Sequence, residues 1–500
     1  MEVSLMPELN WVETLVVVFL LLCVLVGTLP VINTALQFLT LPLHAFRNHY
    51  GKAAPYHPRI AVLIPAWNEG LVLGQAIERL TQLEYPADRV RIFVIDDAST
   101  DDTPEVVAAK AAAFPGRVVH LRRDKGGQGK AHTLNHGLDI VLADEWTEAV
   151  LIMDADVIFA RDSLRKMSRH LADEKVGAVT AYIAEGSRDR NYLTRFIAIE
   201  YVIGQLSARR TQNVGGAIAC LAGGAQLHSR ANLEAIGGRI PTGTLAEDTM
   251  TTFEGQLAGR RMVFEPRAVV LAEEPRTIDS LWKQRLRWAR GNVQLTSIYR
   301  HLWFRPSRVH NLGSFAFGLA WFTILLLPAF MILAATALLV LLVLHSDIAE
   351  FVFRIMWISA ACIYLFSMLF AVQLDGRIGR QSWREALMFP GLGALILMAI
   401  ALFPWLFEAG LSDLGLTLTD ENRFIWAVVF YLWGPISMLG VWLARAVEPL
   451  PAGRFFAGLL LYICGYGSLL CAITVDSYIK EWRHADAAWI KTEKIGRVDS

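Results

Sequence analysis

The sequence lacks several features that would assign it to a common class of protein. Its 500 residues include only five cysteines, none in a CxxC pair, so neither a zinc site nor a disulfide framework is expected. Lysine and arginine number 47, as do aspartate and glutamate, so the net charge is zero and nothing argues for a nucleic-acid partner. No basic segment precedes the first apolar run, which argues against a cleaved signal peptide.

Apolar residues, by contrast, are in excess. They make up 54% of the chain and the mean hydropathy is +0.38, too apolar for an ordinary soluble enzyme. The run from Glu13 to Leu43 is far longer than the ~20 residues that span a bilayer, so a retained anchor is expected within residues 1–50, with a bend near Pro30. Five further apolar blocks follow within residues 310–476: Leu312–Leu344, Phe351–Leu374, Ala386–Phe407, Phe424–Leu443 and Phe455–Val475. The first is counted as one span, since each half would hold only about 17 residues.

The charges that flank these blocks predict an orientation. Acidic residues precede the anchor and Arg47, Lys52 and Arg59 follow it, so the positive-inside rule places the next domain in the cytoplasm. A lipid bilayer is therefore an expected partner, and a bacterial inner membrane is the expected location. The later loops alternate in sign as five spans require, but the basic tail of residues 477–500 would then lie outside, which leaves the number of spans open.

A polar domain over residues 55–300 separates the anchor from the expected membrane bundle. Its apolar runs RIAVLIPAW, RIFVIDDAS, RVVHLRR, AVLIMDADV and VGAVTAYI are typical of strands. Amphipathic helices are expected between the first of them, at Leu71–Leu83, Thr103–Phe114, Ala131–Leu142 and Ser163–Asp173. Alternating strands and helices predict an α/β fold with a largely parallel, doubly wound sheet, which binds ligands at the carboxyl ends of its strands.

Carboxylates gather at those strand ends and in nearby loops. They are Glu69 after LIPAWN, Asp96 and Asp97 in VIDDASTDD, Asp154 and Asp156 in MDADV, and Glu247 and Asp248 in TLAEDTM. Any one pair alone is more typical of a helix cap or a solvated turn. Several carboxylates in one crevice repel each other, however, and this repulsion needs a divalent cation or a hydrogen-bonded ligand to compensate it.

The pair Asp154 and Asp156 suits Mg²⁺ or Mn²⁺ held by few protein ligands, with water and a phosphorylated substrate completing the coordination. A diphosphate ligand is therefore implied. The stretch RRDKGGQGKAHTLN places Lys125 and Lys130 beside flexible glycines just before a helix, where their charge would complement phosphate, although such a stretch alone is usually only a loop.

A further signal is SLWKQRLRWARGN, from Ser280 to Asn292. On a helix, Gln284, Arg287, Trp288 and Gly291 lie on one face, so an amide, a guanidinium and an indole point the same way. The alternative is an amphipathic helix at the membrane surface with Arg and Trp anchors, and both interpretations can hold together.

With these residues in place, the chain resembles the membrane-integrated family 2 glycosyltransferases, the group of cellulose, hyaluronan, chitin and poly-N-acetylglucosamine synthases. The motifs IPAWNE, DDAST, DAD, the ED pair and Gln-x-x-Arg-Trp occur in the family order and cover most of the chain. The resemblance implies a nucleotide-sugar-binding (GT-A-like) domain beside a helical transmembrane bundle, with a UDP-sugar donor and a growing polysaccharide acceptor.

The resemblance also implies a role for each motif. Asp96 or Asp97 would contact the uridine, Asp154 the ribose or diphosphate, and Asp156 the metal, with Glu69 and Lys130 in the same donor site. Asp248 of the pair Glu247–Asp248 would be the general base. Gln284, Arg287 and Trp288 would bind the diphosphate and the acceptor end of the growing chain.

These expectations favour an inverting, processive synthase that extrudes its product, and two alternatives stay open. One is a single transfer to a polyprenyl phosphate or glycolipid, and the other is a transporter or scaffold with a degenerate nucleotide-binding domain. The loop LAGGAQLHSR departs from the acceptor-side loop expected for the family, so the sequence names neither the sugar, nor its linkage, nor any accessory subunit.

Overall fold

The structure is a computed structural model that describes residues 10–47, 49–50, 54–405, 409–410, 420–447, 454–485 and 498. It divides into two compact units, which are considered separately below. One contains residues 37–318, 371–382 and 480–500, and holds the α/β domain. The other contains residues 1–36, 319–370 and 383–479, and consists of apolar helices. The expected acidic loop at Asp413 and most of the basic tail lie outside the described residues.

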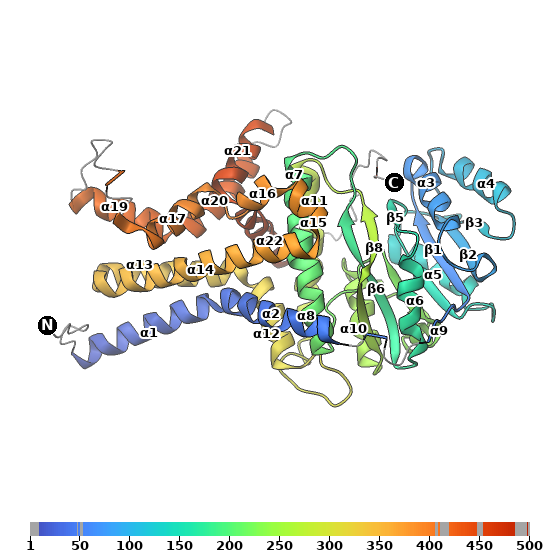
Figure 1. The fold of residues 1–500 in the computed structure, drawn as a ribbon, viewed down its shortest axis with the longest axis horizontal. Helices are drawn as coiled ribbons and strands as arrows, with labels where there is room; N and C mark the ends of the chain where they lie inside the picture. Colours follow the sequence, from blue (N-terminus) through green and yellow to red (C-terminus); the bar gives the residue numbers. More distant parts are fainter. Residues whose placement is uncertain are drawn as a thin grey trace. The chain divides into compact units, whose positions relative to one another are not determined.

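The α/β domain is built on one eight-stranded sheet with the order β3-β2-β1-β4-β7-β6-β8-β5 (Figure 1). The strands are β1 (Ile60–Ala66), β2 (Val90–Asp96), β3 (Val118–Arg122), β4 (Ala149–Ile152), β5 (Val157–Phe159), β6 (Val176–Glu185), β7 (Gln226–Ser229) and β8 (Arg261–Ala272). The first four run parallel, as predicted. The expectation of a largely parallel sheet fails beyond β4, because β7 runs antiparallel to β4 and β6, and β5 antiparallel to β8.

The predicted helices of this domain are confirmed within a few residues. They are α3 (Gly70–Thr81), α4 (Thr103–Ala113), α5 (Lys130–Val141) and α6 (Ser163–Ser168), the last continued by a 3-10 turn, Arg169–Ala172. Alternate side chains of β1, Ala61 and Leu63, pack in one buried cluster with Leu134 and Leu138 of α5. The alternate residues Ile60, Val62 and Ile64 are fully buried as well, so both faces of β1 are covered, which explains why this strand reads as a continuous apolar run.

The second half of the domain is mainly helical around β6, β7 and β8. Its helices are α7 (Tyr192–Glu200), a π-helix (Tyr201–Ser207), α8 (Ala208–Gly215), α9 (Arg230–Ala235), α10 (Glu247–Leu257) and α11 (Ile278–Ile298). The pairing of β6 with β8 shifts register at Ala181, so the residues between Glu265 and Val269 of β8 form a bulge. A π-helix and a bulge are both irregularities that often occur near functional sites.

The helical unit matches the apolar blocks in part. Its longer helices are α1 (Trp11–Gly27), α13 (Leu327–Leu344), α14 (Ser346–Leu374), α17 (Leu392–Leu402), α19 (Asp420–Tyr431), α20 (Trp433–Val447), α21 (Arg454–Cys464) and α22 (Tyr466–Trp482). Two further apolar helices, α2 (Leu29–Phe46) and α12 (Phe315–Leu325), have residues in both units, as do α14 and α22, whose last residues belong to the unit of the α/β domain. Among the described residues, three helices (α2, α13 and α14) are long and apolar enough to cross a membrane, or up to five if each bent pair is one span. These helices are compatible with membrane insertion.

Several expected spans differ in detail. The N-terminal run breaks at Thr28, close to Pro30 as expected. Within the block Leu312–Leu344, α13 is long and apolar enough to cross a membrane, and α12 is shorter. The block Ala386–Phe407 contains only the short helix α17, and the last two blocks are bent by 70° and 104°. The second bend falls at Gly465, whose positive φ of 87° and contact with Gly391 leave no room for a Cβ.

Candidate functional site

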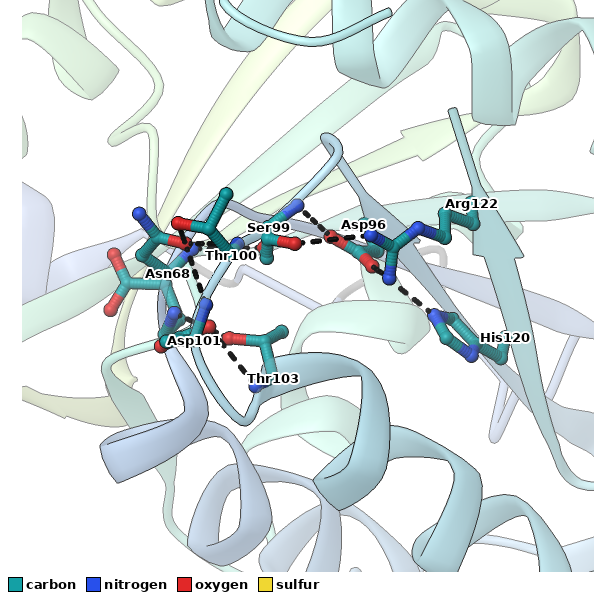
Figure 2. A network of polar contacts seen from close by, with 9 residues as sticks. Asn68, Asp96, Ser99, Thr100, Asp101, Thr103, His120 and Arg122 are labelled. Carbon is teal, nitrogen blue, oxygen red and sulfur yellow. Dashed lines mark hydrogen bonds and ion pairs between the residues drawn. The ribbon is translucent and has the colours of Figure 1, made fainter. Parts of the chain in front are cut away.

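The loops that follow β1 and β2 are joined by a network of hydrogen bonds (Figure 2). The Asn68 Oδ1 accepts from the Thr100 backbone N–H at 2.8 Å, and the Ser99 hydroxyl accepts from the Asn68 N–H at 2.9 Å. Glu69 follows at the start of α3, where its own N–H donates to the Thr103 hydroxyl at 2.8 Å. The network fixes both strand ends, and with them the edge of the predicted donor site.

The two neighbouring aspartates at the end of β2 have different partners. Asp96 is fully buried; its Oδ1 accepts from the Ser99 N–H at 2.8 Å and its Oδ2 lies 3.1 Å from Arg122 Nη1 (Figure 2). Asp97 is also buried, but it pairs with Arg123 and accepts from the Gly127 N–H at 3.0 Å. Asp96 therefore stabilises the turn after β2, whereas Asp97 holds the glycine-rich loop that leads to Lys130.

The first four residues of the motif MDADV form a turn, and only its last residue, Val157, belongs to a strand. β4 ends at Ile152 and β5 begins at Val157, so Asp154 and Asp156 lie, half-buried, in the turn between two strands that are not neighbours in the sheet. Asp154 Oδ1 is 2.5 Å from Lys130 Nζ at the start of α5. Lys130 Nζ also lies 4.0 Å from Glu247 Oε1, so this one ammonium group is shared by two of the predicted acidic motifs.

Helix α10 begins with the predicted acidic pair, Glu247 and Asp248, in its first turn. Burial and the adjacent charge of Asp248 raise the pKa of Glu247, although Lys130 and Arg287 oppose the shift. Burial alone would lower the pKa of Lys130, but Asp154 and Glu247 outweigh it and raise that pKa. A small cavity of about 10 Å³, enough for one water molecule, is lined by Lys130, Glu247, Asp248 and Gln226. Glu247, Asp248 and Lys130 therefore form one cluster, in which the charge of each group acts on the others.

The loop LAGGAQ, which departs from the expected family pattern, lies directly against this cluster. Lys130 Nζ donates to the carbonyl oxygen of Gly223 at 3.3 Å. A Cβ at Gly223 would lie 3.1 Å from Lys130 Nζ and 3.3 Å from Asp248 Oδ2, and one at Gly224 would lie 3.4 Å from Asp154 Oδ2. The two glycines therefore let the backbone approach the site closely. The sequence showed this loop only as a departure from the family pattern and did not indicate this role.

Hydrogen bonds from two buried threonines hold this loop in place. Thr180 of β6 accepts from the Ala222 N–H and donates to the Ala225 carbonyl, each at 3.0 Å. Thr252 of α10 accepts from the Leu221 N–H at 2.9 Å and donates to the Asp248 carbonyl at 2.7 Å. The loop is thereby fixed to the same helix turn that carries Glu247 and Asp248.

Helix α11 carries the Gln-x-x-Arg-Trp motif and packs on the start of α10. Gly291, predicted to share the face of Gln284, Arg287 and Trp288, lies so close to Ala246 that a Cβ would be 2.6 Å from the Ala246 Cβ. Gln294, one turn further, accepts from the Leu245 N–H at 3.1 Å. This face of α11 therefore adjoins the acidic pair, and the charge of Arg287 acts on Glu247.

One residue between the motif positions, Arg285, was not predicted. Its side chain is 5% exposed and makes two hydrogen bonds, at 3.1 and 2.8 Å, to the carboxylate of Glu200 at the end of α7. It also donates to Gln284 Oε1 at 2.5 Å and lies 4.1 Å from the centroid of the Trp288 ring. Arg285 thus contacts two of the three motif side chains, and its partner Glu200 carried no sequence signal.

The predicted metal residues fit a particular kind of ion site. Among the residues that the structure describes, no group of three or more His, Cys, Asp or Glu side chains could hold a metal alone. Asp154 and Asp156 instead offer two hard carboxylates in one turn, which suits a cation that takes its remaining ligands from water and phosphate. The oxygen donors exclude a site that depends on thiolate or imidazole.

An α/β sheet with carboxylates, a lysine and an arginine at its carboxyl edge defines the class of enzymes that use phosphorylated donors. Residues 57–291 match the family model described as "Glycosyltransferase like family 2". The chain contains a glycosyltransferase family 2 domain, and it is a glycosyltransferase.

Three curated relatives are similar to the chain over this region. The probable glycosyltransferase YdaM of Bacillus subtilis is 29% identical over 329 residues, or 64% of this chain and 75% of the relative. The β-monoglucosyldiacylglycerol synthase of Synechocystis is 30% identical over 48% of this chain and 49% of the relative. The poly-β-1,6-N-acetyl-D-glucosamine synthase of Staphylococcus epidermidis is 30% identical over 49% of this chain and 56% of the relative. The chain therefore spans about half the length of the last two.

Among solved structures, a mannosyltransferase of Pyrobaculum calidifontis in complex with GDP-Man and Mn²⁺ aligns with a TM-score of 0.48 and 24% identity. The alignment covers 75% of this chain and 98% of the other.

Proposed function

We propose that the chain is an inverting, metal-dependent glycosyltransferase that polymerises a UDP-sugar into a β-linked polysaccharide at the cytoplasmic face and extrudes it through its membrane helices. The observation that carries this proposal is the cluster of Lys130, Asp154, Glu247 and Asp248 beside the face of α11 that bears Arg287. The relatives named for polysaccharide synthesis support the polymer product.

Each side chain then has a role that its surroundings support. Asp248 takes the proton from the acceptor hydroxyl as that hydroxyl attacks the anomeric carbon. Lys130, held between Asp154 and Glu247, presents a positive charge toward the diphosphate of the donor. Mg²⁺ or Mn²⁺ bound at Asp156 would neutralise the departing nucleoside diphosphate. Because Gly223 has no side chain, no Cβ crowds the Asp248 carboxylate.

The α11 face supplies the acceptor end of the site. The Trp288 indole offers an apolar surface on which a pyranose ring can stack, and the guanidinium of Arg285 on its other side holds the ring in position. Gln284 offers an amide, and Arg287 adds a second cation near the donor.

A second candidate function is the transfer of one sugar to a lipid acceptor. It is favoured by relatives of similar identity that are named β-monoglucosyldiacylglycerol synthases. It uses the same carboxylates and lysine but does not require Trp288 to hold a polymer. The donor site is therefore common to both functions, and the acceptor distinguishes them.

The experiment is to incubate the purified full chain in nanodiscs with a panel of UDP-sugars, Mg²⁺ or Mn²⁺, and either no added acceptor or diacylglycerol. We expect a ladder of products from one UDP-sugar, and loss of the ladder in Trp288→Ala. Products limited to one sugar, with Trp288→Ala fully active on lipid, would support the second function. Unchanged transfer in Asp156→Ala with Asp248→Asn would contradict both and favour a non-enzymatic role for the site.

A further inference from the structure

A second cavity, of about 320 Å³, lies in the α/β unit away from the glycosyltransferase motifs. It is lined by Tyr50, His57, Arg165, Lys166, Arg169 and Arg267. His57 precedes β1, whereas the donor site follows its carboxyl end, and the seven residues of β1 separate the two ends by about 20 Å. The cavity is therefore distinct from the donor site, and none of the predicted site residues lines it.

The positive charge of this basic cavity is only partly compensated. Arg165 pairs with Glu84 at 3.1 Å and Lys166 with Asp162 at 2.6 Å. Within the described part of the chain, neither Arg169 nor Arg267 forms an ion pair, and the buried Nε of Arg169 has no hydrogen-bond partner. Two guanidinium groups thus face one cavity with unused donors, which is the chemistry that recognises phosphate.

The cavity is also built in advance of any ligand. The buried carboxylate of Glu265 accepts from the Tyr50 hydroxyl at 2.5 Å, from His170 Nε2 at 2.8 Å and from the Arg267 N–H at 2.9 Å. The Tyr50 ring in turn supports the Arg169 guanidinium, which lies 4.2 Å from its centroid. Arg267 itself is carried on the bulge of β8, and Lys166 donates to its carbonyl at 2.8 Å. The cationic groups therefore need little reordering to bind an anion.

The cavity is close to the end of an apolar helix. α2 ends at Phe46 and Tyr50 is four residues later, so the two are separated by at most about 14 Å of chain. Arg47 fixes this end of α2 to the domain through the carbonyls of Asn213 and Val214, at 3.0 and 2.9 Å. Because α2 is long and apolar enough to cross a membrane, the cavity would lie within reach of lipid headgroups.

We propose that this basic cavity is a second ligand site that binds a phosphate-bearing anion, supplied by the headgroup of an anionic lipid or by a free phosphate compound. The two uncompensated arginines, Arg169 and Arg267, bind the phosphate oxygens, and Tyr50 and Glu265 hold the arginines in place. Anion binding at this cavity does not depend on which sugar the donor carries.

The test uses the full chain in detergent, titrated with dioctanoyl phosphatidylglycerol, dioctanoyl phosphatidylcholine and inorganic phosphate at constant ionic strength. We expect saturable binding of phosphatidylglycerol, weakened about tenfold in Arg267→Gln and further in Arg169→Gln/Arg267→Gln, because each change removes charge-assisted hydrogen bonds. Saturable binding of inorganic phosphate with the same dependence on the arginines would identify a free phosphate as the source. A matched control, Arg239→Gln/Arg261→Gln, removes two exposed arginines of the same unit and should bind as the wild type does.

Three results would overturn the proposal: no saturable binding of either anion, equal binding of phosphatidylcholine, or full binding by the double variant. If Arg169→Gln unfolds, Arg267→Gln alone still tests the proposal. The Arg267 side chain makes no described hydrogen bond or ion pair, so its loss should not unfold the protein. The melting temperature of each variant without ligand identifies such unfolding.

Discussion

A substitution of Arg285 tests which contacts fix the position of α11, the helix with the Gln-x-x-Arg-Trp motif. The substitution Arg285→Met keeps an unbranched apolar stem and removes the charged guanidinium group. It leaves the carboxylate of Glu200, which is 19% exposed, without its guanidinium partner. It also removes the group that contacts Gln284 and the Trp288 ring. The variant should therefore lose both stability and acceptor binding, for separate reasons.

The size of the stability loss follows from burial. Breaking a buried ion pair from one side costs about 3–5 kcal/mol, and the partial exposure of Glu200 favours the lower end, about 3 kcal/mol. For a domain of this size, that free energy lowers the melting temperature by roughly 6–12 °C. In Glu200→Gln/Arg285→Met no charge is left unpaired, so much of this loss should be recovered and the two changes should not be additive.

The assay combines melting temperature with the acceptor KM and kcat of the full chain in nanodiscs. Because Trp288 stays unsupported in the double variant, its acceptor KM should stay raised although its melting temperature recovers. Arg300→Met, an exposed arginine near the end of α11, is the control and should change neither. The positioning role of Arg285 is refuted if the double variant restores the acceptor KM. The stabilising role of its ion pair with Glu200 is refuted if Arg285→Met melts within about 2 °C of the wild type.

The other predictions concern the donor cluster and the basic cavity. Lys130→Met should remove the ammonium group that Asp154 and Glu247 share and raise the donor KM at least tenfold, and a donor KM within twofold of wild type would contradict the shared ion pair. Gly223→Ala places a Cβ 3.1 Å from Lys130 Nζ and should lower kcat/KM, whereas Gly243→Ala, which meets nothing within 4 Å, should not. Asp156→Asn should shift the Mn²⁺ concentration needed for half-maximal activity upward, and an unchanged metal requirement would exclude Asp156 as a ligand. Burial acts to raise the pKa of Glu265, but hydrogen bonds from His170 and Tyr50 lower it overall, so its ionised form stabilises the fold. The melting-temperature difference between wild type and Glu265→Gln should therefore be full above about pH 4.5 and shrink as the pH falls below it, and a constant difference would show that the charge is not involved.

The fold was predictable where local patterns were strong. The strands β1, β2 and β3 and helices α3, α4 and α5 fall within a few residues of their predicted ranges, because continuous apolar runs and helical periods specify them locally. β5 and β7 have only three and four residues, which is too short for a period to show. The break at Gly465 also depends on a contact with Gly391, far away in the sequence.

The candidate site was likewise predictable where its residues belong to local motifs, and not where distant residues pair. Lys130, Asp154, Glu247 and Asp248 were predicted from their positions at strand and helix ends, and the structure brings these four together. Their chemical roles stay predictions. Arg285 and Glu200 were missed because their ion pair joins residues 85 apart in sequence, and neither belongs to a motif. Pairing across such a distance is decided by packing, which no local pattern records.

The charge of the cluster argues for a divalent cation independently of any motif. Four carboxylates, Asp154, Asp156, Glu247 and Asp248, lie in the two acidic motifs, and three cations, Lys130, Arg287 and Arg209, act on them, so the formal sum is 3 − 4 = −1. A nucleoside diphosphate adds further negative charge, and such an anion would be repelled from a site that is already negative. One divalent cation changes this sum to −1 + 2 = +1, so donor binding measured with and without EDTA should differ more than tenfold in the wild type. In Asp154→Asn/Asp156→Asn the difference should largely disappear, because the carboxylates that both attract the cation and repel the donor are gone.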